Sequence, residues 1–413
     1  MKITIHRGAN QIGGCVTEIA TTKSKILIDL GSNLPGTASA DYTQSEIELL
    51  CKGVNGIFYT HYHGDHIGHI NSVPNHIPQY IGQVSKEVLL CKYNALNKHL
   101  DYSKTIKTIE RFDIYKYNKT ITINDGDIKI TPYYVSHSAC NAHMFKIEAE
   151  GLTILHTGDF RKHGYLGKGL MNTLNDYVNQ VDFLIIEGTM LSRKSEAVKH
   201  EVEIKKEMKH LINTYKGKCI FVLCSSTDMD RLASFKAACK ETNTPLLCDY
   251  YQKEILDIFT KHCKFGNNLF NFGYVKRCYY KPNKRFFDLF KSGFLIFVRQ
   301  SHIKFVRQML KHYPDAELVY SMWRGYYAGN DKQIIPDVAG IVNSFNGRIH
   351  YLHTSGHADV ETLQEVCKAT RPRLGIIPIH KDPTSHFEDL EIADTFNIIS
   401  SSCKINNIDI EIK

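Results

Sequence analysis

The part of the sequence richest in chemically active groups is His61–His66, which reads HYHGDH and directly follows the apolar run 56–60. Three imidazoles and one carboxylate within six residues can all face one point in a tight turn. Imidazole and carboxylate suit zinc or a similar divalent ion, and a catalytic site keeps one position open for water. A purely structural cluster would bury four polar groups without compensation. We therefore predict a metal centre at this turn.

The spacing inside this turn favours two ions. His61 and His63 alternate along the chain and can point the same way, whereas Asp65 and His66 can reach a second ion close by. Two-metal sites clamp the attacking and the leaving oxygens of a displacement at phosphorus or carbon. The turn thus predicts hydrolytic chemistry.

Three further residues follow apolar, strand-like runs in the same way: Asp29 in ILIDLG, His137 in VSHSACNAH and Asp159 in HTGDF. Each of them alone is more often a surface or helix-capping residue than a ligand. Together with HYHGDH, and in this order, they resemble the signature of the metallo-β-lactamase superfamily. The resemblance implies an αββα sandwich in which Asp29 orders the histidine-rich turn.

Three later motifs resemble those of the β-CASP nucleases, the branch that includes RNase J and the pre-mRNA cleavage endonucleases. They are Glu187 in FLIIEGT, His357 in TSGHAD and His380 in IIPIH. A histidine at the third of these motifs is typical of the members that act on RNA, whereas the DNA-repair members carry an aliphatic residue there. The sequence departs from the RNase J pattern at Lys381, where a glycine is expected.

The resemblance implies a two-zinc site, for which manganese is the alternative ion. One ion would be bound by His61, His63 and His137 and the other by Asp65, His66 and His380, with Asp159 bridging both. The ions would activate a water for attack on phosphorus.

The resemblance also suggests roles for other residues. We expect His357 to contact the scissile phosphate or to protonate the leaving 3′-oxygen, and Glu187 to orient a histidine. The predicted catalytic residues are Asp29, Asp65, Glu187 and His357. Substrate contacts are expected from Ser355 and Gly356, before a helix predicted at 358–369, and from Ser225 and Ser226 in SSTDMDR. A serine-capped helix start is the alternative for the second pair.

The positive charge of the chain is concentrated in one segment. Between Lys261 and Lys311 the sequence has twelve Lys and Arg against one acid, Asp288, although the whole chain carries only +8. Aromatic residues lie between these basic residues. Cations beside rings are typical of grooves for single-stranded nucleic acid, so we expect single-stranded RNA as the partner. The alternative is a solvated basic face over an ordinary aromatic core.

The order of elements predicts an α/β protein with an inserted domain. Short strands dominate up to Phe183–Ile186, and β-α alternation from 195 to 344 indicates a parallel sheet. We expect a metallo-β-lactamase domain from 1–190 and 345–413, and an inserted β-CASP domain at 191–344. The insert and its charge argue against a small-molecule esterase or lactamase.

Apolar runs and cysteine spacing indicate the cellular location of the protein. No apolar run is long enough to span a membrane and no secretory leader is recognisable, so a membrane partner is not expected. The twelve cysteines show no C-x-x-C spacing, which favours reduced thiols and a cytoplasmic location. The alternatives to a ribonuclease are a DNA-processing nuclease of the same fold and a nucleic-acid-binding member that does not cleave. The sequence leaves open exonuclease or endonuclease action and whether the chain forms a homo-oligomer.

Overall fold

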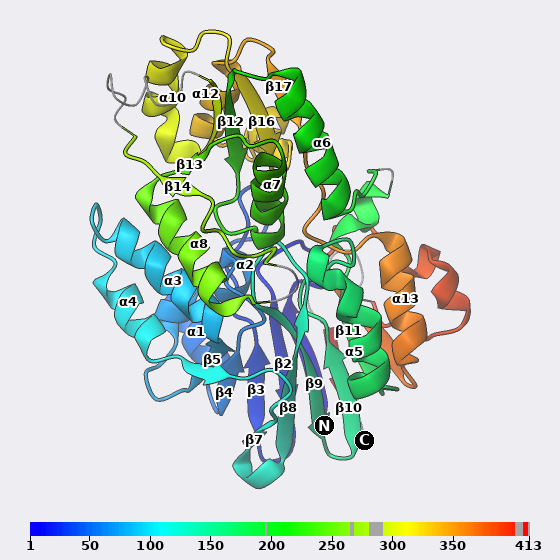
Figure 1. Ribbon diagram of the computed structural model, residues 1–413. Coiled ribbons are helices and arrows are strands. Elements are labelled where there is room, and N and C mark those ends of the chain that lie inside the picture. The colour runs from blue at the N-terminus through cyan, green and yellow to red at the C-terminus, as the bar shows by residue number, and fades with distance from the viewer. Residues whose placement is uncertain (195, 265–267, 281–291, 401–407, 412–413) are drawn as a thin grey trace. The chain divides into compact units, whose positions relative to one another are not determined.

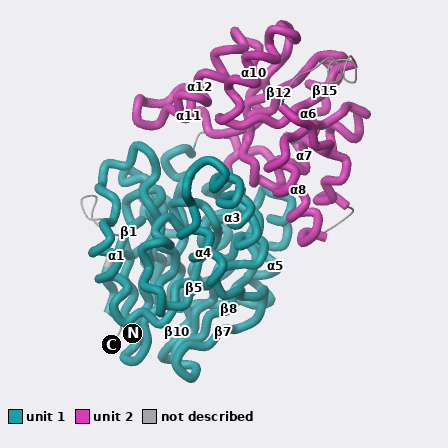
Figure 2. The backbone as a smooth tube through the Cα atoms, turned by 90° about the vertical axis from the view of Figure 1, so that its left-hand side faces the viewer, with its two compact units in different colours: residues 1–196, 356–413 teal, residues 197–355 magenta. Residues whose placement is uncertain are grey.

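The computed structural model describes the chain except residues 195, 265–267, 281–291, 401–407 and 412–413 (Figure 1). Two compact units are formed, unit 1 from residues 1–196 and 356–413 and unit 2 from residues 197–355 (Figure 2). The assignment of 191–344 to an inserted domain remains a prediction. In the described part of the chain, no helix is both long and apolar enough to cross a membrane.

Unit 1 contains two β-sheets. The first is antiparallel from β1 to β3 and parallel from β3 to β6. Its described strands are, in spatial order, β19 (Ile408–Glu411), β1 (Lys2–Arg7), β2 (Val16–Ala20), β3 (Lys25–Ile28), β4 (Gly56–Phe58), β5 (Gln79–Gly82) and β6 (Asp113–Tyr115). The second has β18 (Gly375–Ile379), β11 (Phe183–Glu187), β10 (Leu152–His156), β9 (Ala142–Ala149), β8 (Ile128–Val135) and β7 (Ile121–Ile123).

A continuous apolar core joins the two sheets. Isoleucines at alternate positions, such as Ile3 and Ile5 in β1, point to one face because side chains alternate along a strand. They pack in the same cluster as Ile147 of β9 and Ile185 of β11. Each side chain of this size contributes about 1.5–3 kcal/mol when fully buried. The sheets therefore form the inner layers of a sandwich.

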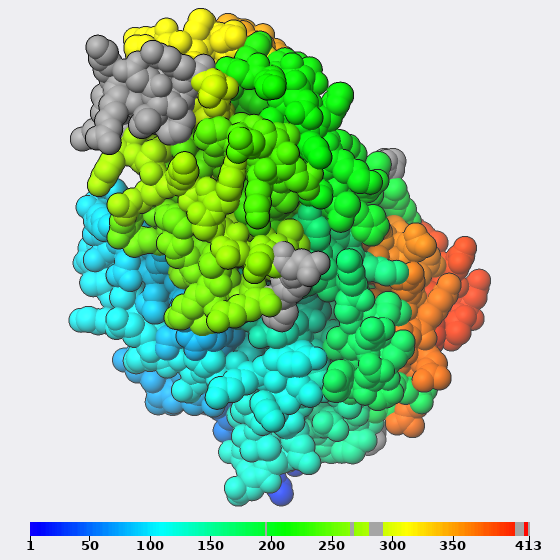
Figure 3. Space-filling view, viewed as in Figure 1, coloured from blue at the N-terminus to red at the C-terminus, as the bar shows by residue number. Residues whose placement is uncertain are grey.

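Helices cover the outer faces of the sandwich (Figure 1). Leu170 of α5 and Leu363 of α13 pack on the outer face of the second sheet, in a cluster that also holds Phe387 and Ile392. In Figure 3 the orange surface that contains α13 lies beside the red surface of the C-terminal segment. The predicted αββα fold class is confirmed. The helices of unit 1 are α1 (Gln44–Leu50), α2 (Gly64–Ile67), α3 (Gln83–Leu96), α4 (Ser103–Glu110), α5 (Leu170–Thr173) and α13 (Val360–Thr370).

Unit 2 is a parallel sheet between two layers of helices, as Figure 2 shows. Val306 of α10 and Ile341 of α12 pack against Phe221 and Ile296 on one face. The described strands are β14 (Lys276–Arg277), β13 (Leu246–Cys248), β15 (Phe294–Val298), β12 (Cys219–Cys224), β16 (Glu317–Ser321) and β17 (Ile349–Tyr351). The helices are α6 (Glu201–Thr214), α7 (Met229–Glu241), α8 (Tyr250–His262), α10 (Ile303–Leu310), α11 (Gly325–Ala328) and α12 (Pro336–Asn343).

Helix starts differ from the expectations where a polar side chain caps the helix. Helix α13 begins at Val360, two residues later than expected, because the Asp359 carboxylate accepts the N–H of Thr362. Helix α7 is capped by Asp228, so the alternative of a serine cap in SSTDMDR is wrong.

The basic segment is only partly described. Lys281, Lys284, Arg285 and Lys291, with Phe286, Phe287 and Phe290, lie outside the described residues. Phe270 and Phe272 are buried in the core and cannot stack on a base, whereas Tyr279 is 79% exposed. The described aromatic residues thus divide between core packing and surface.

Unit 2 contains a fully buried ion pair. The Arg231 Nη2 group lies 2.9 Å from Oε1 of Glu201, and both side chains are completely inaccessible to water. The Nε–H group also donates to Glu201, and the other N–H groups donate to the Ser321 hydroxyl and to the backbone carbonyls of Leu352 and Thr354. Loss of one partner leaves an uncompensated buried charge.

We expect Arg231→Met to lower the free energy of unfolding by about 3–5 kcal/mol, measured by urea denaturation of the full chain followed by circular dichroism. The matched control is Lys205→Met, which removes an exposed pair with Glu241 and should cost about 1 kcal/mol or less. Equal losses in the two variants would contradict the structural role of the buried pair.

Candidate metal centre

The HYHGDH turn lies where β4 leaves the first sheet. Strand β4 ends at Phe58, and His63 then occupies the N-cap position of the short helix α2. His61 precedes the helix, whereas Asp65 and His66 lie in its only turn, so the side chains leave the backbone in different directions. A single tight turn can thereby supply two groups of ligands.

A buried carboxylate holds this turn in place. Asp29, with a left-handed φ of 61°, accepts the Thr60 backbone N–H at 2.7 Å and the Thr60 hydroxyl at 2.8 Å. It also lies 2.7 Å from Nδ1 of His66. A carboxylate can only accept, so Nδ1 of His66 carries the proton and Nε2 is directed into the site.

The imidazoles of His61, His63 and His137 form one cluster able to hold a metal ion. Nδ1 of His63 lies 3.0 Å from Nε2 of His61 and 3.2 Å from Nε2 of His137. His137 donates its Nδ1–H to the Gly356 carbonyl at 2.7 Å. A Cβ at position 356 would come within 2.6 Å of the Ser138 hydroxyl, which explains the glycine.

The first cluster has few hydrogen-bond donors. The Thr60 hydroxyl donates to Asp29, so it accepts the Nδ1–H of His61 at 3.1 Å. The Nε2 atoms of His61 and His137 then carry lone pairs and can only accept hydrogen bonds. The single N–H of a neutral His63 can donate to only one of these two atoms. The Ser138 hydroxyl reaches Nε2 of His137 only at 3.5 Å. Nitrogen lone pairs that converge with so few donors fit a divalent cation.

His66, His380 and Asp65 form a second cluster beside the first. Nε2 of His380 lies 3.2 Å from Oδ2 of Asp65, and Nε2 of His66 lies 3.8 Å from the same oxygen. His380 has a left-handed φ of 50° and its backbone N–H donates to the Gly8 carbonyl at 2.7 Å. The Thr189 hydroxyl is 2.7 Å from Nδ1 of His380 and sets its ring orientation.

Asp159 lies between the clusters. Its Oδ2 atom is 3.1 Å from Nε2 of His66 and 3.7–3.9 Å from nitrogens of four other histidines. Those four are His61, His137, His357 and His380. The structure thus brings together all seven residues predicted as metal ligands, and all of them belong to unit 1.

The charges of the site favour a cation. Burial lowers the pKa of His61 and His137 well below the ordinary value and lowers that of His63 to about 4. Burial also opposes charge on His66, but the neighbouring carboxylates outweigh it and raise the pKa of His66 well above the ordinary value. Conversely, the nearby histidines hold the pKa of Asp159 well below its usual range despite burial. The neutral imidazoles of His61 and His137 and the ionised carboxylate of Asp159 are thus in the protonation states that metal binding requires, whereas His66 must release a proton on binding.

Glu187 and His357 form a pair at the edge of this centre. The Glu187 carboxylate accepts the backbone N–H groups of Phe160, Thr189 and Ala358 and lies 3.2 Å from Nδ1 of His357. The Glu187 side chain is fully buried, whereas that of His357 is 20% exposed. The His357 ring is therefore accessible to a substrate.

Comparison with known proteins agrees with this geometry. Residues 14–170, which include the HYHGDH turn, His137 and Asp159, match the metallo-beta-lactamase superfamily. Residues 344–394, which include His357 and His380, match the Zn-dependent metallo-hydrolase RNA specificity domain. The chain therefore contains a metallo-β-lactamase domain. A metallo-hydrolase domain of this kind implies that the chain binds divalent metal.

The curated relatives point to the RNase J-like, β-CASP branch. Ribonuclease J from Helicobacter pylori (strain ATCC 700392 / 26695) is 29% identical over 170 residues, which is 39% of this chain and 23% of that protein. An RNase J-like protein from Methanocaldococcus jannaschii is 27% identical over 198 residues, or 45% and 42% of the two chains. The matched parts thus span less than half of these relatives.

The same fold occurs in a crystal structure of a protein of unknown function from Enterococcus faecalis V583. It aligns with 99% of this chain and 99% of its own, with a TM-score of 0.73 and 18% sequence identity. At this identity the likeness shows that the two chains share a fold and nothing more.

The residues predicted to contact substrate are less well defined. Gly356 belongs to unit 1 and binds His137 through its carbonyl, whereas Ser225, Ser226 and Ser355 belong to unit 2. Ser225 is 3.3 Å from the Thr227 hydroxyl, and the Ser226 carbonyl accepts the Gln252 side chain at 2.9 Å. Their use as phosphate contacts remains a prediction.

Lys381, the departure from the RNase J pattern, is buried. Its ammonium group is 2.7 Å from the Asn10 side chain and 2.9 Å from the Ser385 carbonyl. The lysine thus ties the segment after β18 to the loop between β1 and β2.

Sequence reasoning missed three residues of the metallo-β-lactamase centre. Thr60 and Thr189 orient histidines through their hydroxyls, and the signal was their position immediately before His61 and two residues after Glu187. Cys15 lies beside His66 and His380. Burial, followed by nearby carboxylates, raises the pKa of its thiol well above the ordinary value.

We expect Asp29→Asn to weaken metal binding about 10–100-fold, because an amide supports the His66 ring less well than a carboxylate does. The measurement is competition with a chromophoric chelator, with circular dichroism to verify the fold. Asp113→Asn, at an exposed position of β6, is the matched control and should leave affinity unchanged. Equal affinity in both variants would exclude an orienting role for Asp29.

Proposed function

We propose that this protein is a metal-dependent ribonuclease that hydrolyses RNA phosphodiester bonds through a two-metal site. The observation that carries the proposal is the position of the Asp159 Oδ2 atom, within 3.9 Å of nitrogens from five histidines. Two ligand clusters that share one carboxylate are the arrangement that a two-metal hydrolase needs.

The ligand sets follow from the two clusters. His61, His63 and His137 would bind one ion, Asp65, His66 and His380 the other, and Asp159 would bridge them. Zinc suits these imidazole and carboxylate ligands, and manganese is the alternative. Bound divalent ions lower the pKa of water toward about 7 and neutralise charge on phosphoryl oxygens.

The protein's own residues orient the substrate and move a proton. Glu187 holds Nδ1–H of His357, so a protonated His357 presents its Nε2–H to the phosphate or to the leaving 3′-oxygen. When the P–O3′ bond breaks, that proton passes to O3′, while the contact with Glu187 keeps the His357 ring in position. The partial exposure of His357, in a centre that is otherwise buried, supports this role.

Several observations favour RNA as the substrate. The match to an RNA specificity domain covers His357 and His380, and the named relatives are Ribonuclease J and an RNase J-like protein. In unit 2, Arg277 lies over the Tyr250 ring at 5.3 Å and Arg299 over the Tyr251 ring at 4.9 Å. Cations paired with rings suit single-stranded RNA.

We also propose that the protein acts in the cytoplasm. All eleven described cysteines are free thiols, which fits a reducing cytoplasm.

We expect purified protein with zinc, and separately with manganese, to cleave single-stranded RNA labelled at either end. Asp65→Ala should abolish cleavage, and 5′-monophosphorylated and 5′-hydroxyl substrates should be compared directly. Release of mononucleotides from the 5′ end would identify an exonuclease, and internal fragments would identify an endonuclease. Cleavage of matched DNA but not RNA would replace the proposal with a DNA nuclease, and RNA binding without cleavage would replace it with a binding protein.

We expect His357→Ala to lower kcat about 10²–10⁴-fold with metal content unchanged, because it removes a proton donor and not a ligand. Glu187→Gln should also lower kcat, since an amide holds the Nδ1–H of His357 less well than the carboxylate does. Glu361→Gln, at an exposed position of α13, is the matched control. Loss of bound metal in His357→Ala would contradict this division of roles.

A further inference from the structure

Cys15 lies immediately before strand β2, next to the metal ligands His66 and His380. Its backbone N–H donates to the carbonyl of Asp65 at 3.0 Å, and its own carbonyl accepts the N–H of Gly31 at 3.0 Å. A Cβ at Gly31 would lie 1.7 Å from the Asp65 carbonyl, so only glycine permits this close approach. The HYHGDH turn and Cys15 are therefore locked together through the backbone.

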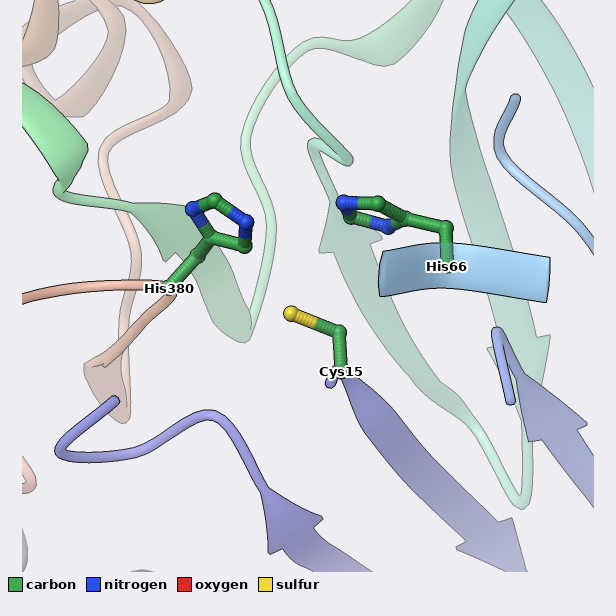
Figure 4. A group of neighbouring side chains, drawn as sticks. All are labelled: Cys15, His66 and His380. Atoms are coloured by element: carbon green, nitrogen blue, oxygen red, sulfur yellow. The ribbon is translucent and has the colours of Figure 1, made fainter. Parts of the chain in front are cut away.

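The Cys15 thiol faces the second ligand cluster. Its sulfur lies within 4.8 Å of ligand nitrogens of His66 and His380, and these two nitrogens also lie within 4.8 Å of each other. Figure 4 shows the three side chains converging from different parts of the chain, with the sulfur directed toward the space between the two rings. Nitrogen and sulfur bound to one zinc are about 3.6 Å apart at ordinary bond lengths.

The environment of Cys15 differs from that of the other buried cysteines. Its side chain is 1% exposed, and within the described residues the thiol has no hydrogen-bond partner. It is also the only described cysteine that belongs to any of the possible metal clusters. Cys51 in the same unit is equally buried but lies in no such cluster among the described residues. Simple packing accounts for Cys51 but leaves the position of Cys15 unexplained.

We propose that Cys15 is an additional, soft ligand of the ion bound by His66, His380 and Asp65, and that it biases this position toward zinc and against manganese. Thiolate ligands select zinc, whereas manganese prefers oxygen ligands. On binding, the thiol proton leaves to solvent and the sulfur lone pair is donated to the ion. The inference rests on the metal binding within the proposed function and not on cleavage of RNA.

Cobalt provides a direct test, because a thiolate ligand gives a sulfur-to-cobalt charge-transfer band in the near ultraviolet. The full chain is stripped of metal, loaded with two equivalents of Co²⁺ under anaerobic conditions, and its bound metal is quantified. We expect the band in the wild type and in the matched control Cys51→Ser, and its loss in Cys15→Ser. Competition titrations should show the preference for zinc over manganese falling about tenfold or more in Cys15→Ser.

The outcomes separate the two proposals. Bound cobalt without the band in the wild type, or the band retained in Cys15→Ser, overturns the role of Cys15 and leaves the ribonuclease proposal standing. No bound metal at all overturns both, whereas absent RNA cleavage with the expected spectra overturns only the ribonuclease proposal. If Cys15→Ser does not fold, Cys15→Ala and the wild-type and Cys51→Ser spectra decide the question.

Discussion

The carboxylate of Asp159 is the constraint around which the metal centre is arranged. One of its oxygens faces nitrogens of five histidines. Two of them belong to the HYHGDH turn, and the others follow β8, precede α13 and follow β18. Such a concentration of polar groups is unfavourable in a core unless each has a partner. The two sheets must therefore bring the ends of β4, β8, β10 and β18 to one place. The apolar contacts between the sheets keep these strand ends rigid.

A surrounding layer of buried hydrogen bonds makes that arrangement specific. Asp29 orients His66, Thr189 orients His380, and the Gly356 carbonyl orients His137. Two of the residues involved, Asp29 and His380, adopt left-handed backbone conformations that cost energy in non-glycine residues. Strain of this kind persists only where other contacts enforce it, and here those contacts are the Asp29–Thr60 and His380–Gly8 hydrogen bonds.

The residues themselves predicted the part of the site whose members lie close together along the chain. Residues that folding brings together from distant positions were predicted only through the family resemblance or not at all. The HYHGDH turn could be recognised because four possible ligands follow one apolar run, whereas Asp29 and Asp159 could be recognised only together with it, from the order of motifs that resembles the family. Short elements such as β5 and α1 were not predicted, since four to seven residues carry too little periodicity. Cys15 could not be recognised either, because its neighbours in the site are 51 and 365 positions away along the sequence.

The order in which the site is encoded has a consequence for biosynthesis. Strand β18, which carries His380 to the centre, pairs in parallel with β11, and the whole of unit 2 is encoded between them. During translation β11 therefore remains an open sheet edge until residues beyond unit 2 emerge, at about 5–20 residues per second. A chain interrupted anywhere in unit 2 has the HYHGDH turn but no His357 or His380. If the proposed ligand set is right, such a fragment is inert, and hydrolytic capacity arises only in chains whose synthesis has passed His380.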